Sequence, residues 1–352
     1  MNSVVTDAHE VHFGAVAKAA LQQYLRNSTY SKVFVLVDEM TEACCLGILR
    51  EFVGCNFDGV FCIKPGEQYK NIETCVSVWE DLSDFGGDRK SVLINLGGGV
   101  VTDLGGFVAS TFKRGIDFIN IPTTLLAMVD ASLGGKTGVD LGSLKNQVGV
   151  INQPKMVLIV PEFLRTLEAR QRTSGTAEMF KHGLIADKPY WEALRQTTDF
   201  SDEAHIRQSV HIKNQVVAQD PTEQHVRKKL NFGHTLGHAI ESYFLEQPEK
   251  ETLLHGEAIA IGMILEAFLS HKLTGLSMLE VQEIKSSLLV HFEKVDFSKQ
   301  DIEIILDLLK HDKKNAHGNI NFVLLESIGI AQIDVKVPNE LFVDAFAYYK
   351  ES

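Results

Sequence analysis

Short apolar runs alternate with amphipathic stretches in the first half of the chain. Helical periodicity occupies two of the intervening stretches, 74–82 and 103–111. Alternation of strands and helices indicates a parallel sheet wound on both faces, so we expect a Rossmann-like α/β domain over residues 1–160. The runs that predict strands buried on both faces are 33–38, 60–63, 91–96, 118–122 and 156–160.

The pattern changes after Pro161 to long amphipathic stretches with few strand signals. A late β-rich region, 319–325 with 333–337, predicts a hairpin. We therefore expect a mostly α-helical C-terminal domain over residues 161–352. The helices are predicted at 172–185, 202–219, 232–245, 256–273 and 278–291.

Composition indicates a soluble globular protein, because 45% of the 352 residues are hydrophobic and 23% are charged. The N-terminus MNSVVTDAHEVHFG lacks a basic region followed by an apolar one, and no run is as long as a membrane span. We expect a cytoplasmic protein with no membrane partner. The five cysteines are odd in number and lack CxxC spacing, so we expect them to be reduced and buried.

The net charge of −12 argues against a nucleic-acid partner, which would require clustered Lys and Arg. An anionic small molecule would have to be attracted by local cations. The candidates are Lys136, Lys145, Lys213 and Arg227.

A glycine triplet, 97–99, follows the predicted strand 91–96 and precedes an apparent helix from Asp103. Glycines at a strand-to-helix turn let backbone N–H groups approach phosphate oxygens, and the helix N-terminus adds positive potential. The dinucleotide fingerprint GxGxxG is absent, so a bare tight turn is an equally good interpretation of this feature alone.

Small and ionic residues are dense between positions 112 and 146. Loops of this composition that follow the strands of a wound sheet line the crevice where ligands bind. A solvated loop is the alternative for any one of these residues, but it explains the whole cluster less well. The cluster comprises Arg114, Thr123, Thr124, Asp130, Lys136, Asp140, Lys145 and Asn146.

A polar stripe runs through RKKLNFGHTLGHAIESYF, where Arg227, Asn231, His234 and His238 recur at spacings of four, three and four. If this segment is helical, the four side chains share one face. A core helix would carry Leu or Ile there, because burying an unpaired imidazole or guanidinium is costly. The stripe therefore predicts a polar partner at this face, and specifically a metal.

The candidate metal ligands are Glu178, His182, His234, His238 and His255. Spacing alone favours His234 with His238, since two histidines four positions apart form the usual helical zinc pair. A lone histidine is more often a satisfied core or surface residue, but two on the stripe together with His255 favour a metal site.

Together these motifs resemble the 3-dehydroquinate synthase family of sugar phosphate cyclases. The resemblance covers most of residues 65–315, in order. The blocks that carry it are PGEQYK, INLGGGVVTDLGGF, FKRGIDFINIPTTLLAMVDASLGGKTGVD, LKNQVGVINQP, SGTAEMFKHGLI, DPTEQHVRKKLNFGHTLGHAIE, LLHGEAIAIGM and DKK.

The resemblance implies a metal held by Glu178, His234 and His255, which leaves His238 for proton handling. The metal would be zinc, with cobalt or another divalent ion as alternatives. The residues implied to contact NAD are Asp38, Glu67, Lys70, Gly97, Gly98, Gly99, Asp103, Thr123, Thr124, Lys136, Lys145 and Thr166. Those implied to contact the substrate are Asp130, Lys136, Lys145, Asn146, Lys213, Glu223, Arg227, Asn231, His238 and one or both of Lys313 and Lys314, of which Lys314 is the first choice. Arg114 is implied to reach the substrate phosphate of a neighbouring subunit, which predicts a homodimer.

The implied reaction converts 3-deoxy-D-arabino-heptulosonate 7-phosphate into 3-dehydroquinate and phosphate, a step of the shikimate pathway. It combines transient oxidation by NAD, phosphate elimination, reduction, ring opening and aldol closure.

Three alternatives stay open. A metal-dependent polyol or alcohol dehydrogenase would not need the cations listed for the substrate. A sister cyclase would act on another sugar phosphate, and a non-catalytic binding protein would not need a complete metal set.

Overall fold

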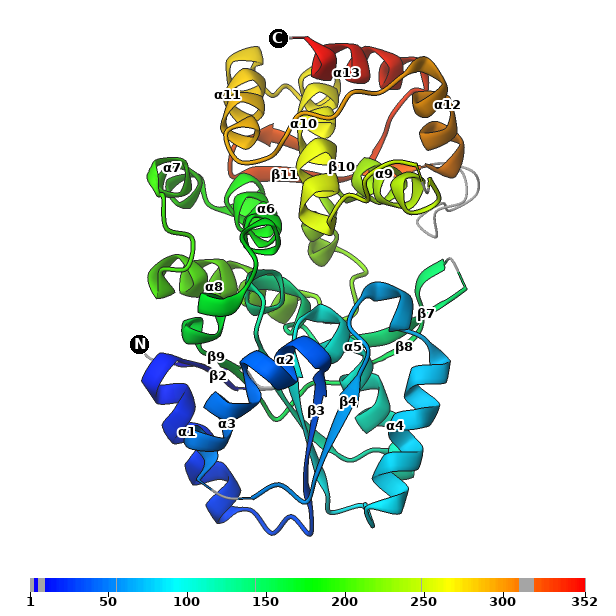
Figure 1. Cartoon of the computed structure of the whole chain (residues 1–352). Coiled ribbons are helices and arrows are strands. Elements are labelled where there is room, and N and C mark those ends of the chain that lie inside the picture. Colours follow the sequence, from blue (N-terminus) through cyan, green and yellow to red (C-terminus); the bar gives the residue numbers. More distant parts are fainter. Residues whose placement is uncertain are drawn as a thin grey trace. The chain divides into compact units, whose positions relative to one another are not determined.

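The structure of the chain is a computed structural model that describes residues 3–5, 10–54, 56–142, 144–247, 249–309 and 320–351. The chain forms two compact units (Figure 1). The first comprises Met1–Arg172 and Ser201–Asn214, and the second comprises Thr173–Phe200 and Gln215–Ser352. Residues 161–172 and 201–214 thus group with the first unit, whereas the sequence pattern suggested one boundary near residue 160.

A sheet of seven strands, counted over the described residues, forms the centre of the first unit, in the order β1-β2-β9-β6-β5-β3-β4. Strand β1 pairs antiparallel with β2, and the other neighbours pair in parallel. The predicted parallel α/β sheet is confirmed. The strands are β1 (Ser3–Val5), β2 (Glu10–Phe13), β3 (Val33–Asp38), β4 (Gly59–Ile63), β5 (Val92–Gly97), β6 (Asp117–Pro122) and β9 (Met156–Ile159).

Helices cover both faces of this sheet (Figure 1). Phe34 and Leu36 of β3 pack into one core with α4 and α5. Val35 and Val37 point to the opposite face, because side chains alternate along a strand, and they are buried as well. The helices of the first unit are α1 (Gly14–Asn27), α2 (Glu39–Cys44), α3 (Leu46–Val53), α4 (Ile72–Asp84) and α5 (Gly99–Thr111), with short helical turns at Glu67–Tyr69, Phe112–Arg114, Ala127–Ala131 and Pro161–Thr166.

An antiparallel hairpin, β7 (Lys136–Leu141) with β8 (Leu144–Ile151), packs against α5. Helix α5 starts at Gly99, not at the predicted Asp103. Gly98 is its N-cap residue, so the helix begins inside the glycine triplet and no loop separates them.

The second unit is mostly helical, as predicted, and carries the predicted hairpin as antiparallel β10 and β11. Helices α6 and α8 each run across the boundary between the two units. The α-helices and strands from residue 169 onward are α6 (Ala169–Ala186), α7 (Lys188–Gln196), α8 (Glu203–Gln219), α9 (His234–Leu245), α10 (His255–Leu273), α11 (Met278–Leu289), α12 (Lys299–Leu308), β10 (Asn321–Ser327), β11 (Ile330–Lys336) and α13 (Glu340–Lys350).

The polar stripe does not lie on one continuous helix, so the condition for its four residues to share one helix face is not met. A short 3₁₀ helix, Val226–Asn231, ends before Phe232, and α9 begins only at His234. Gly233 between them has φ of 79°, a left-handed conformation that favours glycine. A Cβ atom there would lie 2.4 Å from Met263 Cγ of α10, so the break also allows close helix packing.

The cysteine prediction holds only in part. Cys44, Cys45, Cys62 and Cys75 are free thiols, and Cys55 lies outside the described residues. Cys45 and Cys75 are buried, but Cys44 is half-buried and Cys62 is exposed. Cys62 belongs to β4, which is an edge strand among the described strands of the sheet and pairs there with β3.

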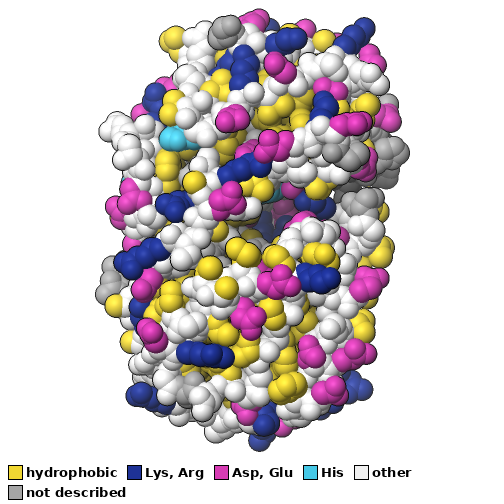
Figure 2. Space-filling view, in the orientation of Figure 1, with side chains coloured by type: hydrophobic (Ala, Val, Ile, Leu, Met, Phe, Trp, Pro, Cys, Tyr) yellow, Lys and Arg dark blue, Asp and Glu magenta, His cyan; other side chains and the backbone are white. Residues whose placement is uncertain are grey.

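Basic and acidic side chains are interspersed on the face shown in Figure 2, and its described residues form no continuous basic patch there. None of the helices described here has the length and apolar character needed to cross a membrane.

Candidate functional site

Three side chains from separate helices converge in the second unit. Glu178 lies on α6, while His234 and His255 are the first residues of α9 and α10. Each offers one ligand atom within 4.8 Å of the others. Glu178 Oε1 lies 3.4 Å from His234 Nε2 and 3.3 Å from His255 Nε2. The structure therefore brings together the three residues that the family resemblance assigned to a metal.

Close packing between helices brings these three side chains together. Helices α9 and α10 lie side by side (Figure 1). A Cβ atom on Gly262 of α10 would lie 2.0 Å from the carbonyl oxygen of Gly233. The backbone N–H of Gly256 donates to Ser174 Oγ at 2.9 Å, which joins the start of α10 to α6. Small residues at these positions are what allow the three ligand-bearing backbones to approach.

Backbone contacts orient His234. Its Nδ1 lies 3.1 Å from the carbonyl oxygen of Phe232, which can only accept, so Nδ1 donates and Nε2 keeps its lone pair. The buried carboxylate of Glu266 on α10 accepts from the backbone N–H groups of Gly233 and Leu236 at 2.6 and 3.1 Å. These bonds cap the N-terminus of α9 and fix the residue from which the His234 side chain projects.

Electrostatics place Glu178 in its charged form. Burial raises the pKa of this carboxyl, but the Lys181 ion pair and the two histidines outweigh it, so the pKa lies well below its ordinary value. Lys181 pairs with Oε2, whereas Oε1 faces the histidines. An ionised carboxylate with one oxygen directed at two imidazoles is a suitable metal donor.

The two histidines respond differently to this environment. Burial, together with the charge of Lys181, lowers the pKa of His234 to about 4, which leaves the imidazole neutral. Burial also lowers the pKa of His255, but its hydrogen bonds to Glu178 and Glu241 outweigh burial and raise it to about 10. A metal ion that binds at His255 Nε2 would displace the proton held there. One carboxylate and two neutral imidazoles then form a donor set that fits a catalytic zinc with positions open for other oxygens.

His238 lies beside this group. Its ring centroid is 5.1 Å from that of His234 and 5.8 Å from that of His255. Among the described residues, however, His234 forms a possible metal-ligand set with Glu178 and His255. His238 belongs to a different possible set, with Glu241 and His255. Spacing alone had favoured His234 with His238, because the fold that brings α6 and α10 to this point is not visible in a local pattern.

The glycine triplet of the first unit lies where parallel strands end. The backbone N–H of Thr123, just after β6, donates to the carbonyl oxygen of Gly97 at 3.0 Å. A Cβ atom on Gly97 would lie 2.5 Å from Val101, and one on Gly98 would lie 3.0 Å from Thr124 Cγ2. The turn therefore presents bare backbone at a helix N-terminus, a cradle that fits the pyrophosphate of a dinucleotide.

A buried network lies in the same unit. Lys70 Nζ donates to Asp103 Oδ2 and Asn146 Oδ1, both at 2.7 Å. Burial lowers the pKa of Lys70, but Asp103 and Glu67 outweigh it and raise the pKa. Asp140 accepts from the backbone N–H of Asn146 at 2.6 Å. The network thus joins α5 to the β7–β8 hairpin.

Two further predicted residues have a clear structural role. Glu67 Oε1 lies 3.8 Å from both Lys70 Nζ and Lys145 Nζ, so these three charges form one group. Asp38 caps α2 by accepting from the backbone N–H of Thr41 at 2.7 Å.

The other predicted residues of the first unit occupy different settings. Lys213 is buried and donates to the carbonyl and the carboxylate of Asp130 at 2.6 and 2.7 Å. Arg114, Lys136 and Thr166 are exposed.

In the second unit, Arg227 is buried and donates to the carbonyl oxygen of Pro221 at 2.6 Å. Asn231 donates to Glu223 Oε1 at 2.7 Å. His182 is fully buried on α6. Lys313 and Lys314 lie outside the described residues.

Sequence reasoning missed Lys181, Glu241 and Glu266, which contact the ligands or the helix that carries them. Lys181 and Glu241 each lie three positions after a residue that was singled out, Glu178 and His238. That spacing places them on the same helix faces and could have identified them.

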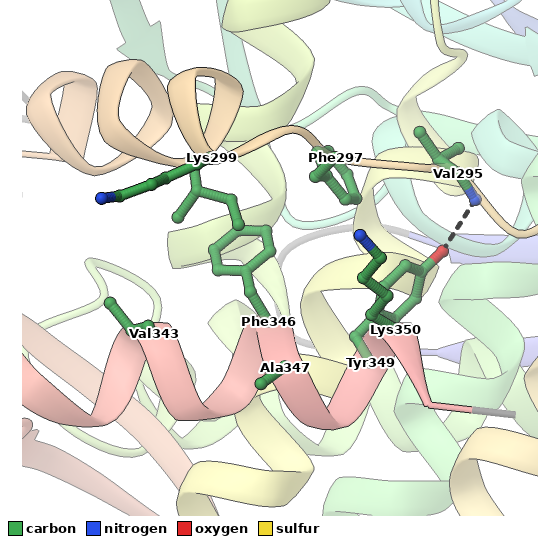
Figure 3. A pocket seen from close by; sticks show the side chains of 9 residues that line it. Val295, Phe297, Lys299, Val343, Phe346, Ala347, Tyr349 and Lys350 are labelled. Carbon is green, nitrogen blue, oxygen red and sulfur yellow. Dashed lines mark hydrogen bonds between the residues drawn. The ribbon is translucent and has the colours of Figure 1, made fainter.

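A small cavity of about 220 Å³ lies between α12, α13 and the segment before α12 (Figure 3). Phe297, Phe346 and Tyr349 form much of its wall. None of the residues that line it was predicted for the site, so it is separate from the chemistry described above.

Comparison with known proteins identifies the family. The family model for the 3-dehydroquinate synthase N-terminal region matches residues 60–174 of this chain. The family model for the 3-dehydroquinate synthase C-terminal region matches residues 175–315. The 3-dehydroquinate synthase of Parabacteroides distasonis is 40% identical over 340 residues, which cover 95% of this chain and 96% of that protein.

Solved structures of other cyclases share the fold. A 2-deoxy-scyllo-inosose synthase complexed with carbaglucose-6-phosphate, NAD⁺ and Co²⁺ has a TM-score of 0.84 at 25% identity, and covers 97% of this chain and 96% of its own. The 2-epi-5-epi-valiolone synthase of Streptomyces hygroscopicus subsp. jinggangensis, with NAD⁺ and Zn²⁺ bound, also has a TM-score of 0.84 at 25% identity, and covers 99% and 98%. Together with the two matched models and the 40% identical relative, these findings show that the chain belongs to the 3-dehydroquinate synthase family.

Proposed function

We propose that this chain is a 3-dehydroquinate synthase. It takes 3-deoxy-D-arabino-heptulosonate 7-phosphate and releases phosphate and 3-dehydroquinate, which makes it a carbon–oxygen lyase of the shikimate pathway. The observation that carries the proposal is the 40% identity to such a synthase over 95% of the chain. The sister cyclases share the fold at 25% identity, so their substrates are the less favoured alternative.

NAD and a divalent metal are the proposed cofactors. Glu178, His234 and His255 would hold the metal, zinc first and cobalt as an alternative, because their donor atoms converge. The turn at Gly97, Gly98 and Gly99 would receive the pyrophosphate of NAD, because it presents bare backbone at the N-terminus of α5. When bound, NAD supplies reversible hydride transfer, and the metal polarises an alcohol or carbonyl oxygen of the substrate.

The other predicted NAD contacts are proposed on position. Asp38, Thr123 and Thr124 lie at the carboxyl ends of β3 and β6, beside the glycine turn in the sheet order. Glu67, Lys70, Asp103 and Lys145 belong to the group of charges described above. Lys136 and Thr166 are carried over from the family resemblance.

Chain residues would bind the anionic substrate and handle its protons. In the first unit, Lys136, Lys145, Asn146 and Lys213 supply donors to phosphate or carboxylate oxygens, with Asp130 holding the Lys213 ammonium in place. In the second unit, Arg227, Asn231 and Glu223 would contribute polar contacts, and His238 would take or return a proton at an imidazole nitrogen. Lys314 is proposed for the substrate from the family resemblance alone.

Turnover with substoichiometric NAD tests the proposal. Purified protein with the heptulosonate phosphate, zinc and a small amount of NAD should release phosphate and dehydroquinate in equal amounts over many turnovers. NADH should not accumulate, because the hydride is returned. Stoichiometric NADH from a simple polyol would instead identify a metal-dependent dehydrogenase. Turnover of a different sugar phosphate in preference would identify a sister cyclase.

We also propose a cytoplasmic homodimer in which Arg114 serves the partner's substrate. The exposed side chain of Arg114 supports this assignment. Arg114→Ala and Lys145→Ala proteins should each be impaired in kcat/KM, and mixed dimers of the two should regain activity. Absence of rescue in verified mixed dimers would mean that Arg114 acts within its own chain.

A further inference from the structure

The His255 ring is held between two carboxylates. Its Nε2 lies 3.3 Å from Glu178 Oε1, and its Nδ1 lies 3.4 Å from Glu241 Oε2. The two nitrogens are on opposite sides of the ring, so only the Nε2 side faces the donor group of Glu178 and His234. Glu241 belongs to α9, and His255 is the first residue of α10.

Glu241 is a costly residue to bury at this position. It is 5% exposed, on a helix that also buries the apolar residues Ile240 and Phe244. A carboxylate in such surroundings is retained at low cost only if it accepts hydrogen bonds. The nearest ring nitrogen of His255 is one such partner, and it cannot serve as a metal ligand on that side while it donates a proton.

A metal-ligating histidine needs its other nitrogen fixed. A carboxylate that accepts from Nδ1–H selects the tautomer with the lone pair on Nε2, sets the ring orientation and raises the basicity of the ligand atom. For His234, the carbonyl oxygen of Phe232 accepts from Nδ1–H and orients the ring in the same way. For His255 the corresponding group is Glu241.

We propose that Glu241 is a positioning residue of the metal centre, which holds His255 so that Nε2 points at the metal. This inference rests on the proposed metal site. The two helices support each other reciprocally, since Glu241 of α9 orients the first residue of α10, and Glu266 of α10 caps the first turn of α9.

Metal affinity of the full chain tests the proposal without any assay of turnover. Metal-free protein is titrated with Zn²⁺ against a chromophoric chelator, and with Co²⁺ while the visible absorption spectrum is recorded. Glu241→Ala should bind Zn²⁺ about 10 to 100 times more weakly than the wild type and should show altered Co²⁺ bands. Glu241→Gln keeps an oxygen that can accept from Nδ1–H, so it should recover part of the affinity and most of the spectrum.

Two controls separate positioning from a general loss of stability or charge. Glu246→Gln removes one charge from an exposed residue at the end of α9 and should leave affinity and spectrum unchanged. The unfolding midpoint of each metal-free variant shows whether the helix pair is intact.

The results that overturn the proposal are distinct. Wild-type affinity and spectrum in both Glu241 variants would remove the positioning role while leaving the metal site in place. Loss of a second equivalent of metal, with the first unchanged, would make Glu241 a ligand together with His238 and His255. A wild-type protein that binds no metal would overturn the proposed centre itself, and the positioning role with it.

Discussion

At the scale of single residues, Gly256 shows how much the candidate metal centre depends on an absent side chain. A Cβ atom at this position would lie 1.8 Å from the carbonyl oxygen of Ser174, which is backbone and cannot rotate away. Gly256 directly follows His255, so any shift that relieves this clash also moves a proposed ligand.

We expect Gly256→Ala to destabilise the protein by about 1–3 kcal/mol, because overpacking of a fixed contact costs that much, and to weaken metal binding. Urea unfolding and zinc titration measure both effects. Gly47→Ala is the matched control, since nothing lies within 4 Å of a Cβ atom there. In helix α3 that change should be neutral or slightly stabilising. Equal stability of the two variants would contradict the close contact.

Gly98 carries the second prediction at this scale. A valine there would meet Thr124, whose Cγ2 lies 3.0 Å from the Cβ position, and its branches would project over the bare backbone of the turn. Gly98→Val should therefore abolish measurable NAD binding in calorimetry while zinc content stays at the wild-type level. Unchanged NAD affinity would remove this turn from the cofactor site.

At the scale of elements, Asp301 joins two helices through one carboxylate. It accepts from Ser298 N at 2.9 Å at the start of α12, from Tyr243 Oη of α9 at 2.6 Å, and from Lys250 Nζ at 2.8 Å. Burial raises the pKa of Asp301, but the bonds from Lys250, Tyr243 and Ser298 outweigh it and lower the pKa.

The sign of the pH dependence follows from that lowered pKa. The unfolded chain protonates Asp301 near its ordinary pKa of about 3.9, whereas the folded protein does so only at lower pH. The carboxylate therefore stabilises the fold above about pH 4, and this contribution is lost as pH falls through the folded pKa.

We expect Asp301→Asn to lower the free energy of unfolding at pH 7 by roughly 1.5–3 kcal/mol, the range for hydrogen bonds to a charged group. The difference from the wild type should shrink as pH falls below about 4. Urea unfolding at pH 7 and pH 3 measures it. A difference that stays constant with pH would show that the charge of Asp301 contributes nothing.

The elements also show what a sequence can and cannot reveal. Strands such as β3 and β5 were predictable because β-branched apolar runs of this length are buried on both faces of a parallel sheet. The break before α9 was not, because Gly233 is needed only where α10 approaches it. Periodicity describes the spacing of residues within one helix and contains no information about the helix that packs against it.

The candidate site divides in the same way. The family resemblance identified Glu178, His234 and His255 as the metal ligands, whereas spacing alone favoured His234 and His238. Lys181 and Glu241 were missed by both arguments. Their spacing of three from Glu178 and His238 could have marked them as neighbours of the site, but an acidic or basic residue on a helix is usually solvated, and their burial is visible only in the fold.

At the scale of the whole molecule, three helices contribute the proposed metal ligands, so metal binding should stabilise the folded chain. Binding to the folded state alone adds about 2.7 kcal/mol when free metal is a hundred times Kd. Chelation should therefore lower Tm in calorimetry, and added zinc should restore it. Glu178→Gln should show neither shift. A Tm that is insensitive to chelator in the wild type would contradict a metal held by these residues.

The return of residues 201–214 to the first unit has a consequence for how the chain can be divided. A single cut in the loop between α7 and α8 would give two fragments, and each would contain parts of both units. The N-terminal fragment keeps α7, whose Trp191 donates to Glu283 of α11 at 2.7 Å, and the C-terminal fragment keeps Lys213, which holds Asp130. With a protease site inserted in that loop, the nicked protein should elute as one species in size-exclusion chromatography and separate only in denaturant. Fragments that separate under native conditions would contradict the conclusion that each unit contains parts of both fragments. Neither unit can therefore be expressed as one continuous segment of the chain, because each unit consists of two segments that are separated in the sequence.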